Sequence, residues 1–250
     1  MKLSVVLATF NESANLSDCL KSVGGWCDEI VIVDGSSTDN TVEIAKQFGA
    51  RIFITDNPKI FHINKQKAID CASFEWILQL DADERVTEKL RNEINIAVKN
   101  PEINGYWIPR KNFFLGRFLM KGGAYPDYSL RLYRKGKGRL PQKDVHEQAE
   151  VVGSVSYLHE PIIHMADVSF SRYMLRFNRY TELIALQIKE RDAKITLVGL
   201  VTYLVFKPIA WFLSVYIRHK GFMDSWQGLI FSFFSALRFP VAYIKFMRNL

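Results

Sequence analysis

The chain has 250 residues, of which 48% are hydrophobic and 24% are charged, and a chain of this length and composition can bury a full core. The net charge of +7 is unevenly distributed: residues 1–167 hold 21 Lys and Arg against 22 Asp and Glu, whereas residues 168–250 hold 12 against 4. Basic residues among long apolar runs indicate that the last third contacts an anionic membrane surface, and we expect no nucleic-acid partner. The three cysteines form no C-x-x-C pair, so we expect reduced thiols in a cytosolic compartment.

The first 84 residues alternate between short apolar runs and helical segments. Four runs are short, apolar and typical of buried strands, at 3–10, 29–34, 51–55 and 76–80. Helices are predicted between them, and the first two end at glycines. This order of elements predicts an α/β fold with a doubly wound, mostly parallel sheet flanked by helices.

Polar clusters follow three of the four predicted strands, at Thr9–Glu12, Asp34–Asp39 and Asp81–Glu84. Because ligands of such sheets bind beyond the carboxyl ends of the strands, we expect the three clusters to converge on one site. No strand is followed by G-x-G-x-x-G or G-x-x-x-x-G-K, which argues against dinucleotide enzymes and P-loop NTPases.

The segment WILQLDADE at 76–84 carries two aspartates, Asp81 and Asp83, one residue apart. In an extended segment alternate side chains share a face, so these carboxylates would offer two hard oxygen ligands to one divalent cation. Such a cation usually keeps its other positions for water and substrate phosphate. A solvated acidic turn is the alternative for Asp-x-Asp taken alone, but the other polar clusters and the basic tail favour the cation site.

Short aromatic strands and glycine turns are predicted over 105–165, between a helix at 85–100 and a helix at about 170–192. Two long apolar segments then follow, at 195–217 and 226–247, and either is long enough to span a bilayer.

The charges of these apolar segments argue against spanning. Lys207 would lie near the bilayer centre, at a cost of roughly 3 kcal/mol. A two-span hairpin would also place Arg218, His219 and Lys220 opposite a cytosolic catalytic domain, against the positive-inside rule. We therefore expect helices that lie in or dip into the interface, with a spanning hairpin and a buried soluble helical domain as alternatives.

The chain resembles the family-two glycosyltransferases with the GT-A fold, and looks most like their bacterial branch of lipopolysaccharide-core glucosyltransferases. The resemblance rests on SVVLATFNE (4–12), EIVIVDGSSTDNT (29–41), WILQLDADE (76–84), SLRLYRKGKG (129–138), VHE (145–147) and KPIAWFLSVYIRHKGFMDSWQG (207–228). It implies a GT-A catalytic domain at 1–168, with a nucleotide-sugar half (1–100) and an acceptor half (101–168), and a membrane-associated helical region at 169–250.

The resemblance further implies inverting transfer of a sugar, with Mg²⁺ or Mn²⁺, from a nucleotide-sugar that we expect to be a UDP-hexose. The expected acceptor is a membrane-associated glycan such as lipopolysaccharide core. The expected location is the cytoplasmic face of the bacterial inner membrane, as a peripheral or monotopic protein. A homo-oligomer is compatible with the resemblance.

The resemblance assigns the donor site residue by residue. The positions that match the nucleotide pocket are Thr9, Asn11 and Glu12. Asp34 matches the aspartate that accepts a hydrogen bond from uracil, with Ser36 beside it. Asp81 matches the aspartate near the ribose, and Asp83 the one that binds the metal. Lys65 and Lys67 align loosely with a polar residue that precedes the fourth strand.

Glycosyl transfer with inversion needs a general base on the face opposite the leaving group, so we expect it from a different chain segment than Asp-x-Asp. Glu147 is our first choice and Asp144 the alternative. His146, between them, is interpreted as a metal or phosphate contact or as a structural histidine.

Two arginines of SLRLYR, Arg131 and Arg134, are candidates for contacting the diphosphate, with surface strand arginines as the alternative. His164 is interpreted as structural.

Three other functions compete with this interpretation. A polyprenyl-phosphate sugar transferase shares the same N-terminal motifs, and a membrane tail suits a lipid phosphate too. A non-enzymatic membrane-surface binding protein would not need paired aspartates and a base. A nucleotidyltransferase would usually carry a glycine-rich loop after the first strand, whereas LATFNES has no glycine.

Overall fold

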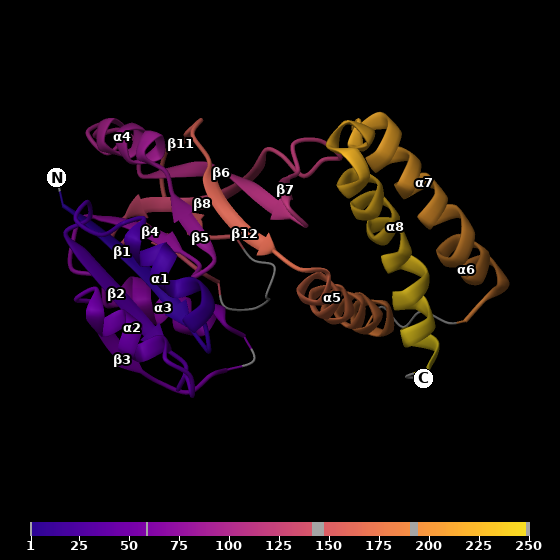
Figure 1. The fold of residues 1–250 in the computed structure, drawn as a ribbon, viewed down its shortest axis with the longest axis horizontal. Helices are drawn as coiled ribbons and strands as arrows, with labels where there is room; N and C mark the ends of the chain where they lie inside the picture. The colour runs from indigo at the N-terminus through magenta and orange to yellow at the C-terminus, as the bar shows by residue number, and fades with distance from the viewer. Residues whose placement is uncertain (1, 59, 142–147, 191–194, 249–250) are drawn as a thin grey trace. The chain divides into compact units, whose positions relative to one another are not determined.

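The computed structural model describes residues 2–58, 60–141, 148–190 and 195–248 (Figure 1). The chain forms two compact units, the first from residues 1–110 and 128–164 and the second from residues 111–127 and 165–250. We call them the first and the second unit. The predicted division at residue 168 differs from this one, because residues 111–127 belong with the C-terminal helices.

The first half of the chain builds a parallel sheet, as its alternating strands and helices predict. β1 (Leu3–Thr9) lies between β2 (Glu29–Asp34) and β4 (Trp76–Leu80), and β3 (Arg51–Ile54) pairs with β2, all in parallel. In the register, Thr9 lies opposite Asp34, so β1 and β2 end side by side. Their carboxyl ends place the loops of both strands at one edge of the sheet.

The second half of the chain extends this sheet with strands of mixed direction. The strand order is β3-β2-β1-β4-β8-β6-β12-β5, and β8 runs antiparallel to β4. The added strands are β5 (Glu84–Val86), β6 (Gly105–Phe114), β7 (Arg117–Phe118), β8 (Asp127–Arg134), β11 (Val155–Tyr157) and β12 (Ile162–Asp167). A separate two-stranded sheet joins β9 (Gly138–Arg139) to β10 (Glu150–Val151). The antiparallel pairing of β12 with β5 brings residues about 80 positions apart into contact.

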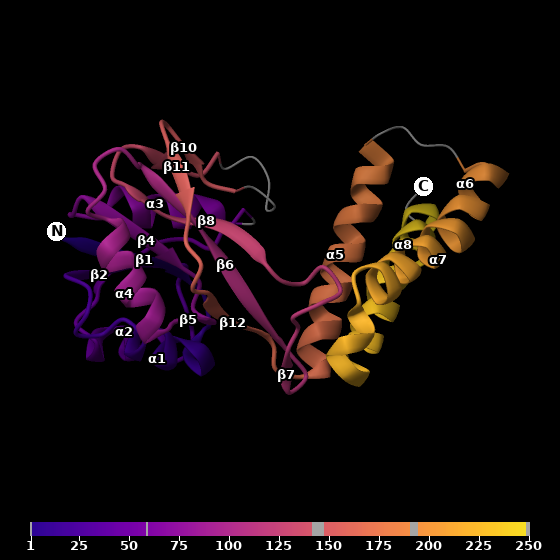
Figure 2. The ribbon, with the colours of Figure 1, turned by 90° about the horizontal axis from the view of Figure 1, so that it is seen from above.

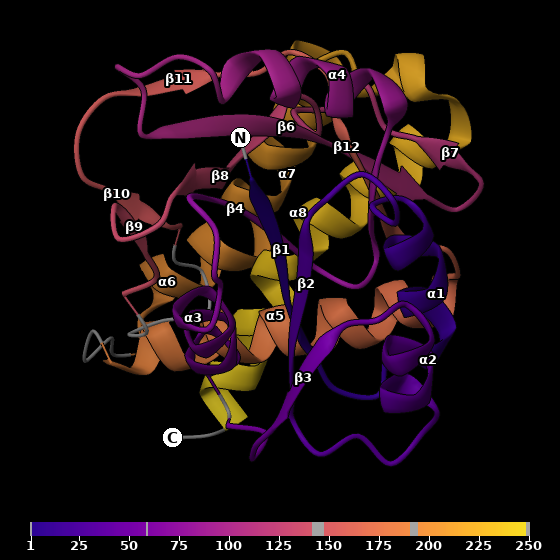
Figure 3. The same cartoon turned by 90° about the vertical axis from the view of Figure 1, so that its left-hand side faces the viewer.

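Strand alternation separates the core of the first unit into two layers. Val5 and Leu7 of β1 pack with α1 (Ser13–Lys21) and α2 (Thr41–Gln47), and Val6 packs on the other face with α3 (His62–Asp70). Figure 3 shows α1 and α2 on one side of β1, β2 and β3, and α3 on the other. Both faces are covered, as a parallel sheet requires. The helix that follows β5 is α4 (Glu88–Ala97), whose Leu90 joins the first layer.

The second unit is mainly helical. Its helices are α5 (Phe170–Glu190), α6 (Leu197–Val201), the π-helical turn η1 (Thr202–Phe206), α7 (Lys207–Leu213), the π-helical turn η2 (Ser214–Arg218), the 3₁₀ turn η3 (Gly221–Asp224) and α8 (Ser225–Arg248). α8 packs against both α5 and α7 (Figure 2). By length and composition alone, the runs Leu197–Arg218 and Gly221–Arg248 are long and apolar enough to cross a membrane. We call these two runs together the tail hairpin.

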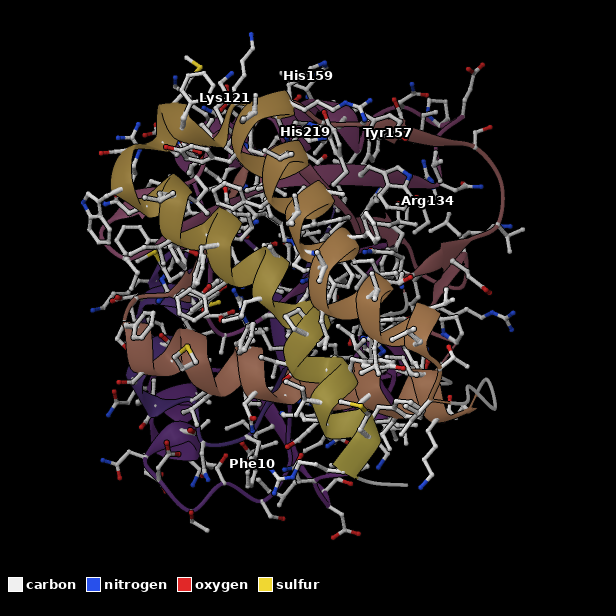
Figure 4. All side chains as sticks on the ribbon, turned by 90° about the vertical axis from the view of Figure 1, so that its right-hand side faces the viewer. Phe10, Lys121, Arg134, Tyr157, His159 and His219 are labelled. Carbon is white, nitrogen blue, oxygen red and sulfur yellow. The ribbon has the colours of Figure 1, made fainter. Side chains whose placement is uncertain are left out.

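A close-packed turn joins the two arms of the tail hairpin. Asp224 is 2% exposed, and its Oδ2 accepts hydrogen bonds from the backbone N–H groups of Met120 and Lys121 at 2.9 and 2.7 Å. The N–H of Gly122 donates to the carbonyl of His219 at 2.9 Å. Lys121 and His219 accordingly lie at the same end of the unit in Figure 4. The segment after β6 is therefore fastened to the tail hairpin by a buried carboxylate.

Candidate active site

Asp34 forms the centre of the site at the end of β2. The Thr9 hydroxyl donates to its Oδ2 at 2.8 Å, and the N–H and hydroxyl of Ser37 donate to its two oxygens, each at 2.7 Å. The side chain is 1% exposed, so its three donors come from the protein and fix its orientation. Ser37 was not predicted. Ser36 instead donates its hydroxyl to the carbonyl of Thr55 at 2.9 Å.

The loop after β1 is joined to the loop after β2 by side-chain hydrogen bonds. Asn11 has a φ of 54°, a conformation that asparagine tolerates better than most residues. Its Oδ1 accepts from the N–H of Thr38 at 2.8 Å, and its own N–H donates to Ser37 Oγ at 2.8 Å. The N–H of Glu12 donates to Thr41 Oγ1 at 2.8 Å. The residues predicted to line the nucleotide pocket therefore lie in two loops that hold each other in place.

The Asp-x-Asp sequence lies in a turn, not in an extended segment as predicted. β4 ends at Leu80, and the N–H of Glu84 donates to the carbonyl of Asp81 at 2.9 Å, which closes the turn before β5. The Glu84 carboxylate in return accepts from the N–H of Asp81 at 2.9 Å. The turn gives Asp81 and Asp83 different neighbours, so the two carboxylates do not form a simple pair.

Asp81 is the partner of two cations. Its carboxylate forms an ion pair with Lys65 of α3 and accepts from Arg131 of β8 at 2.6 Å. Burial alone would raise the pKa of Asp81, but Arg131 and Lys65 hold this pKa well below its usual range. Asp81 is therefore ionised, and its charge is balanced within the protein.

Glu84 completes this buried charge cluster. Its side chain is fully buried and accepts from Arg131 at 2.9 Å, with Nη1 of Arg110 at 3.9 Å. Burial would lower the pKa of Arg131, but Asp81 and Glu84 raise it above its usual value. We call Lys65, Asp81, Glu84 and Arg131 the buried charge cluster.

Two predicted residues lie outside the buried charge cluster. Lys67 donates to Thr55 Oγ1 at 2.8 Å. Arg134 lies opposite Trp76, at the start of β4, with its guanidinium 4.7 Å from the Trp76 ring, and forms an ion pair with Glu75. Asp81 comes five residues later, which corresponds to roughly 16 Å along a strand. The position of Arg134 therefore does not agree with a diphosphate contact.

Asp83 lies beside His164, a histidine whose sequence context predicts a structural role. Its Oδ1 is 3.6 Å from Nε2 of His164, and the two side chains are 17% and 15% exposed. β12 brings His164 opposite Glu84 in the antiparallel pairing with β5. No local pattern in the sequence signals this contact, because it depends on the pairing of two distant strands.

The donor set at Asp83 is compatible with a divalent cation. A carboxylate oxygen and an imidazole nitrogen are ligands that Mn²⁺ accepts, with phosphate oxygens and water in the remaining positions. Asp81 fits this role less well, because two cations already balance its charge. Within the described parts of the chain, no three His, Cys, Asp or Glu side chains converge as a complete metal-binding group. Asp144, His146 and Glu147 lie outside the described residues.

The comparisons with known proteins agree with this geometry. Residues 4–149 match the family described as Glycosyl transferase family 2. The chain is 30% identical, over 95% of its length and 92% of the relative's, to the lipopolysaccharide core biosynthesis glycosyltransferase LpsC of Rhizobium meliloti. It is 25% identical, over 95% of its length and 88% of the relative's, to an uncharacterized glycosyltransferase of Rickettsia felis.

Two solved structures share the fold. The structure of S. aureus TarS 1-349 matches with a TM-score of 0.50 and 16% identity, over 100% of this chain and 89% of that one. The mannosyltransferase PcManGT of Pyrobaculum calidifontis, solved with GDP-Man and Mn²⁺, matches with a TM-score of 0.55 and 12% identity, over 99% and 87%. These likenesses confirm the predicted GT-A architecture of a mixed sheet flanked by helices. With the family match over more than half of the chain, they establish that this protein is a glycosyltransferase of family 2.

Proposed function

We propose that this glycosyltransferase moves a sugar, with inversion, from a UDP-hexose to the core of a lipopolysaccharide. The observation that carries the proposal is the gathering, around the carboxyl ends of β1, β2 and β4, of the fixed Asp34 carboxylate, the buried charge cluster and the Asp83–His164 pair. A nucleotide-sugar consists of a base, a ribose and a diphosphate beside the sugar. Each of these three groups needs its own kind of binding residue, and the three sets of residues must lie next to one another.

Asp34 is the proposed acceptor for the ring N–H of uracil. Its carboxylate is already oriented by Thr9 and Ser37, so little reorganisation accompanies donor binding. A hydrogen bond to a charged carboxylate contributes about 1.5–3 kcal/mol, and bases that lack this ring N–H would forgo it. Asn11 and Glu12 would line the same pocket, and Asp81 would lie near the ribose.

Asp83 and His164 are the residues that would hold Mg²⁺ or Mn²⁺ at the diphosphate. When bound there, the cation supplies neutralisation of the negative charge that develops on the leaving diphosphate. The protein's own part is positional. Arg131 and Lys65 hold Asp81, and Glu84 closes the turn, so that the Asp83 carboxylate is presented on a rigid support.

Glu147 is the proposed general base, with Asp144 as the alternative. The base would take the proton of the acceptor hydroxyl while the oxygen attacks the anomeric carbon from the face opposite the leaving diphosphate. The bond to the acceptor oxygen forms as the bond to the diphosphate breaks, which inverts the anomeric configuration. Both residues fall within the region that matches the family, and their assignment rests on the sequence.

The similarity to LpsC along nearly the whole chain supports a lipopolysaccharide core acceptor. A polyprenyl phosphate is the alternative acceptor. We further propose that the tail hairpin attaches the enzyme to the cytoplasmic face of the inner membrane, with its helices in the interface. The large exposed apolar side chains of the hairpin and the charge of the last third support attachment.

Asp83→Ala tests the proposed chemistry, and Asp18→Ala, which removes an exposed acid of α1, is its matched control. Each protein would be assayed with UDP- and GDP-sugars as donors, and with core oligosaccharide or polyprenyl phosphate as acceptors. Asp83→Ala should keep the fold and nearly abolish transfer, and excess EDTA should do the same to the wild type until Mn²⁺ is restored. Full activity of Asp83→Ala would remove a metal at this residue from the mechanism. Preference for GDP-sugars would contradict the UDP-hexose donor. Preference for polyprenyl phosphate would contradict the lipopolysaccharide core acceptor.

A further inference from the structure

The tail hairpin holds two cations midway along its arms, Lys207 on α7 and Arg238 on α8. Lys207 Nζ lies 3.5 Å from the centre of the Tyr203 ring and 5.9 Å from that of Phe239. The guanidinium carbon of Arg238 lies 4.3 Å from the centre of the Trp211 ring and 4.9 Å from that of Phe239. Both cations therefore face the same phenylalanine ring, each with a second aromatic ring of its own.

Neither cation has a counter-charge in the described part of the protein. Aromatic rings attract a cation through their quadrupole but carry no net charge. Residues 195–250 contain one acid, Asp224, whose carboxylate is bound to the main chain of Met120 and Lys121. Among the residues described, Lys207 and Arg238 form no ion pair, and Nε of Arg238 is buried without a hydrogen-bond partner. Two positive charges thus lie together without compensation.

Another basic residue of α8, Lys245, has hydrogen-bond and ion-pair partners within the second unit. Lys245 donates to the carbonyl and side chain of Asn178 and to the hydroxyl of Thr181, with Glu182 at 3.6 Å. The described residues thus supply polar partners to Lys245 and, to Lys207 and Arg238, only aromatic rings. Because the described residues offer these two cations no balancing charge, an anion from outside the protein can fill this role.

The surface next to Lys207 is apolar and exposed. Val205, Phe206 and Ile209 are 45%, 66% and 55% exposed. A lipid surface covers such side chains and also provides negative charge at a defined depth. Basic side chains are costly at the centre of a bilayer and favourable at the level of its anionic headgroups.

We propose that Lys207 and Arg238 bind the phosphate of an anionic phospholipid and thereby hold the middle of the tail hairpin at the headgroup level. A guanidinium can donate to two phosphate oxygens, and an ammonium adds a third donor. This inference rests on the membrane attachment proposed above. It adds that Lys207 and Arg238 are the binding residues, that a lipid phosphate is the ligand, and that the two side chains lie at the depth of the headgroups. It also places the two prolines, Pro208 and Pro240, at the headgroup level, since each lies within two residues of a cation.

Vesicle flotation of the full chain tests the proposal. The vesicles would contain either phosphatidylcholine alone or equal amounts of phosphatidylcholine and phosphatidylglycerol. Lys207→Gln/Arg238→Gln removes the two cations, and Lys135→Gln/Lys137→Gln removes two exposed cations of the first unit, so both variants have the same net charge. Lys207→Arg/Arg238→Lys keeps the charge at the site. Circular dichroism would confirm the helix content of each variant.

The wild type should bind phosphatidylglycerol vesicles more tightly than phosphatidylcholine vesicles. A basic residue near an anionic surface typically contributes about fivefold in partitioning, so the site variant should bind roughly 30-fold more weakly. The control variant and the charge-keeping variant should stay near the wild type. Equal binding by the site variant and the wild type, or equal losses in the site and control variants, would overturn the proposal while leaving attachment intact. Absence of wild-type binding to either vesicle would instead overturn attachment itself.

A second measurement needs no change at the cations. Because Arg238 lies against Trp211, a phosphate bound there should alter the emission of this tryptophan. Titration of the wild type with a soluble short-chain phosphatidylglycerol should give a saturable change that Trp211→Phe removes. The same change with short-chain phosphatidylcholine would refute selectivity for an anionic lipid.

Discussion

Arg131→Met should destabilise the first unit strongly, because it removes the cation that pairs with both acids of the buried charge cluster. Arg131 is 5% exposed, and one guanidinium nitrogen lies 2.6 Å from Asp81 Oδ2 and 2.9 Å from Glu84 Oε1. Methionine keeps most of the apolar length of the side chain and removes the charge. The two carboxylates would then keep Lys65 and the more distant Arg110, 3.9 Å from Glu84, as their cations.

The expected loss in the free energy of unfolding is about 3–5 kcal/mol, the usual cost of removing one partner of a buried ion pair. Arg134→Met on the same strand is the matched control. It removes an ion pair with the half-exposed Glu75, a contact with the Trp76 ring and hydrogen bonds to the carbonyls of Asn100 and Ile103, so it should cost about 2 kcal/mol. The difference between the two losses in unfolding free energy isolates the contribution of the buried charge from the effect of removing any arginine of β8.

The loss should depend on pH with a definite sign. Arg131 and Lys65 hold the pKa of Asp81 below its unfolded value, which is about 3.9. Asp81 therefore contributes stability that is present above that value and is lost as the pH falls through its lower, folded pKa. The difference between the wild type and Arg131→Met should be largest near neutral pH and should shrink below about pH 4.

Urea unfolding followed by tryptophan fluorescence measures this difference, because Trp76 is fully buried in the first unit. Equal losses in Arg131→Met and Arg134→Met at neutral pH would refute the reasoning, since they would show that the buried charge cluster adds no more than a surface pair. A loss that stays constant down to acid pH would refute the role given to Asp81.

Three further changes have definite expected outcomes. Asp34→Ala should raise the donor KM more than it lowers kcat, and tighter binding of GDP than UDP by the wild type would contradict the uracil assignment. Glu147→Gln should bind donor normally and transfer sugar roughly 10²–10⁴-fold more slowly, whereas an inactive Asp144→Asn with an active Glu147→Gln would give the role to Asp144. Gly228→Ala should lower the melting temperature, although alanine favours helices, because the new Cβ would lie 1.9 Å from the carbonyl oxygen of Gly221. A rise in melting temperature would contradict this expectation, because it would show that the backbone at Gly221 can move to accommodate the new Cβ at little cost.

The parallel half of the sheet was predictable because its signals are local. Each strand there is a short apolar run. The polar residues at its end, such as Thr9 and Asp34, are therefore placed by the position where the strand ends. The two apolar segments of the tail were equally visible, and both are helical. Elements of this kind depend on residues close together in the chain.

The geometry of Asp-x-Asp was not predictable, because it depends on contacts across the sequence. The turn at Asp81 is held by the buried Glu84, beside which β8 places Arg131 and opposite which β12 places His164. Arg131 and Arg134 look alike in the sequence but are three residues apart, so they point to opposite faces of β8. Only the register of β8 against β4 decides which of them reaches Asp81.

The separation of roles between the two aspartates follows from these contacts. The buried charge cluster contains two acids and two bases, so its charges balance before any ligand arrives. In the proposed mechanism the charge that meets the metal and the diphosphate then comes from Asp83, which lies outside the cluster and next to His164. Loss of Asp81 would unbalance buried cations and should weaken the fold together with activity. Asp83 is not one of the four residues of the cluster, so its loss should affect activity more than stability.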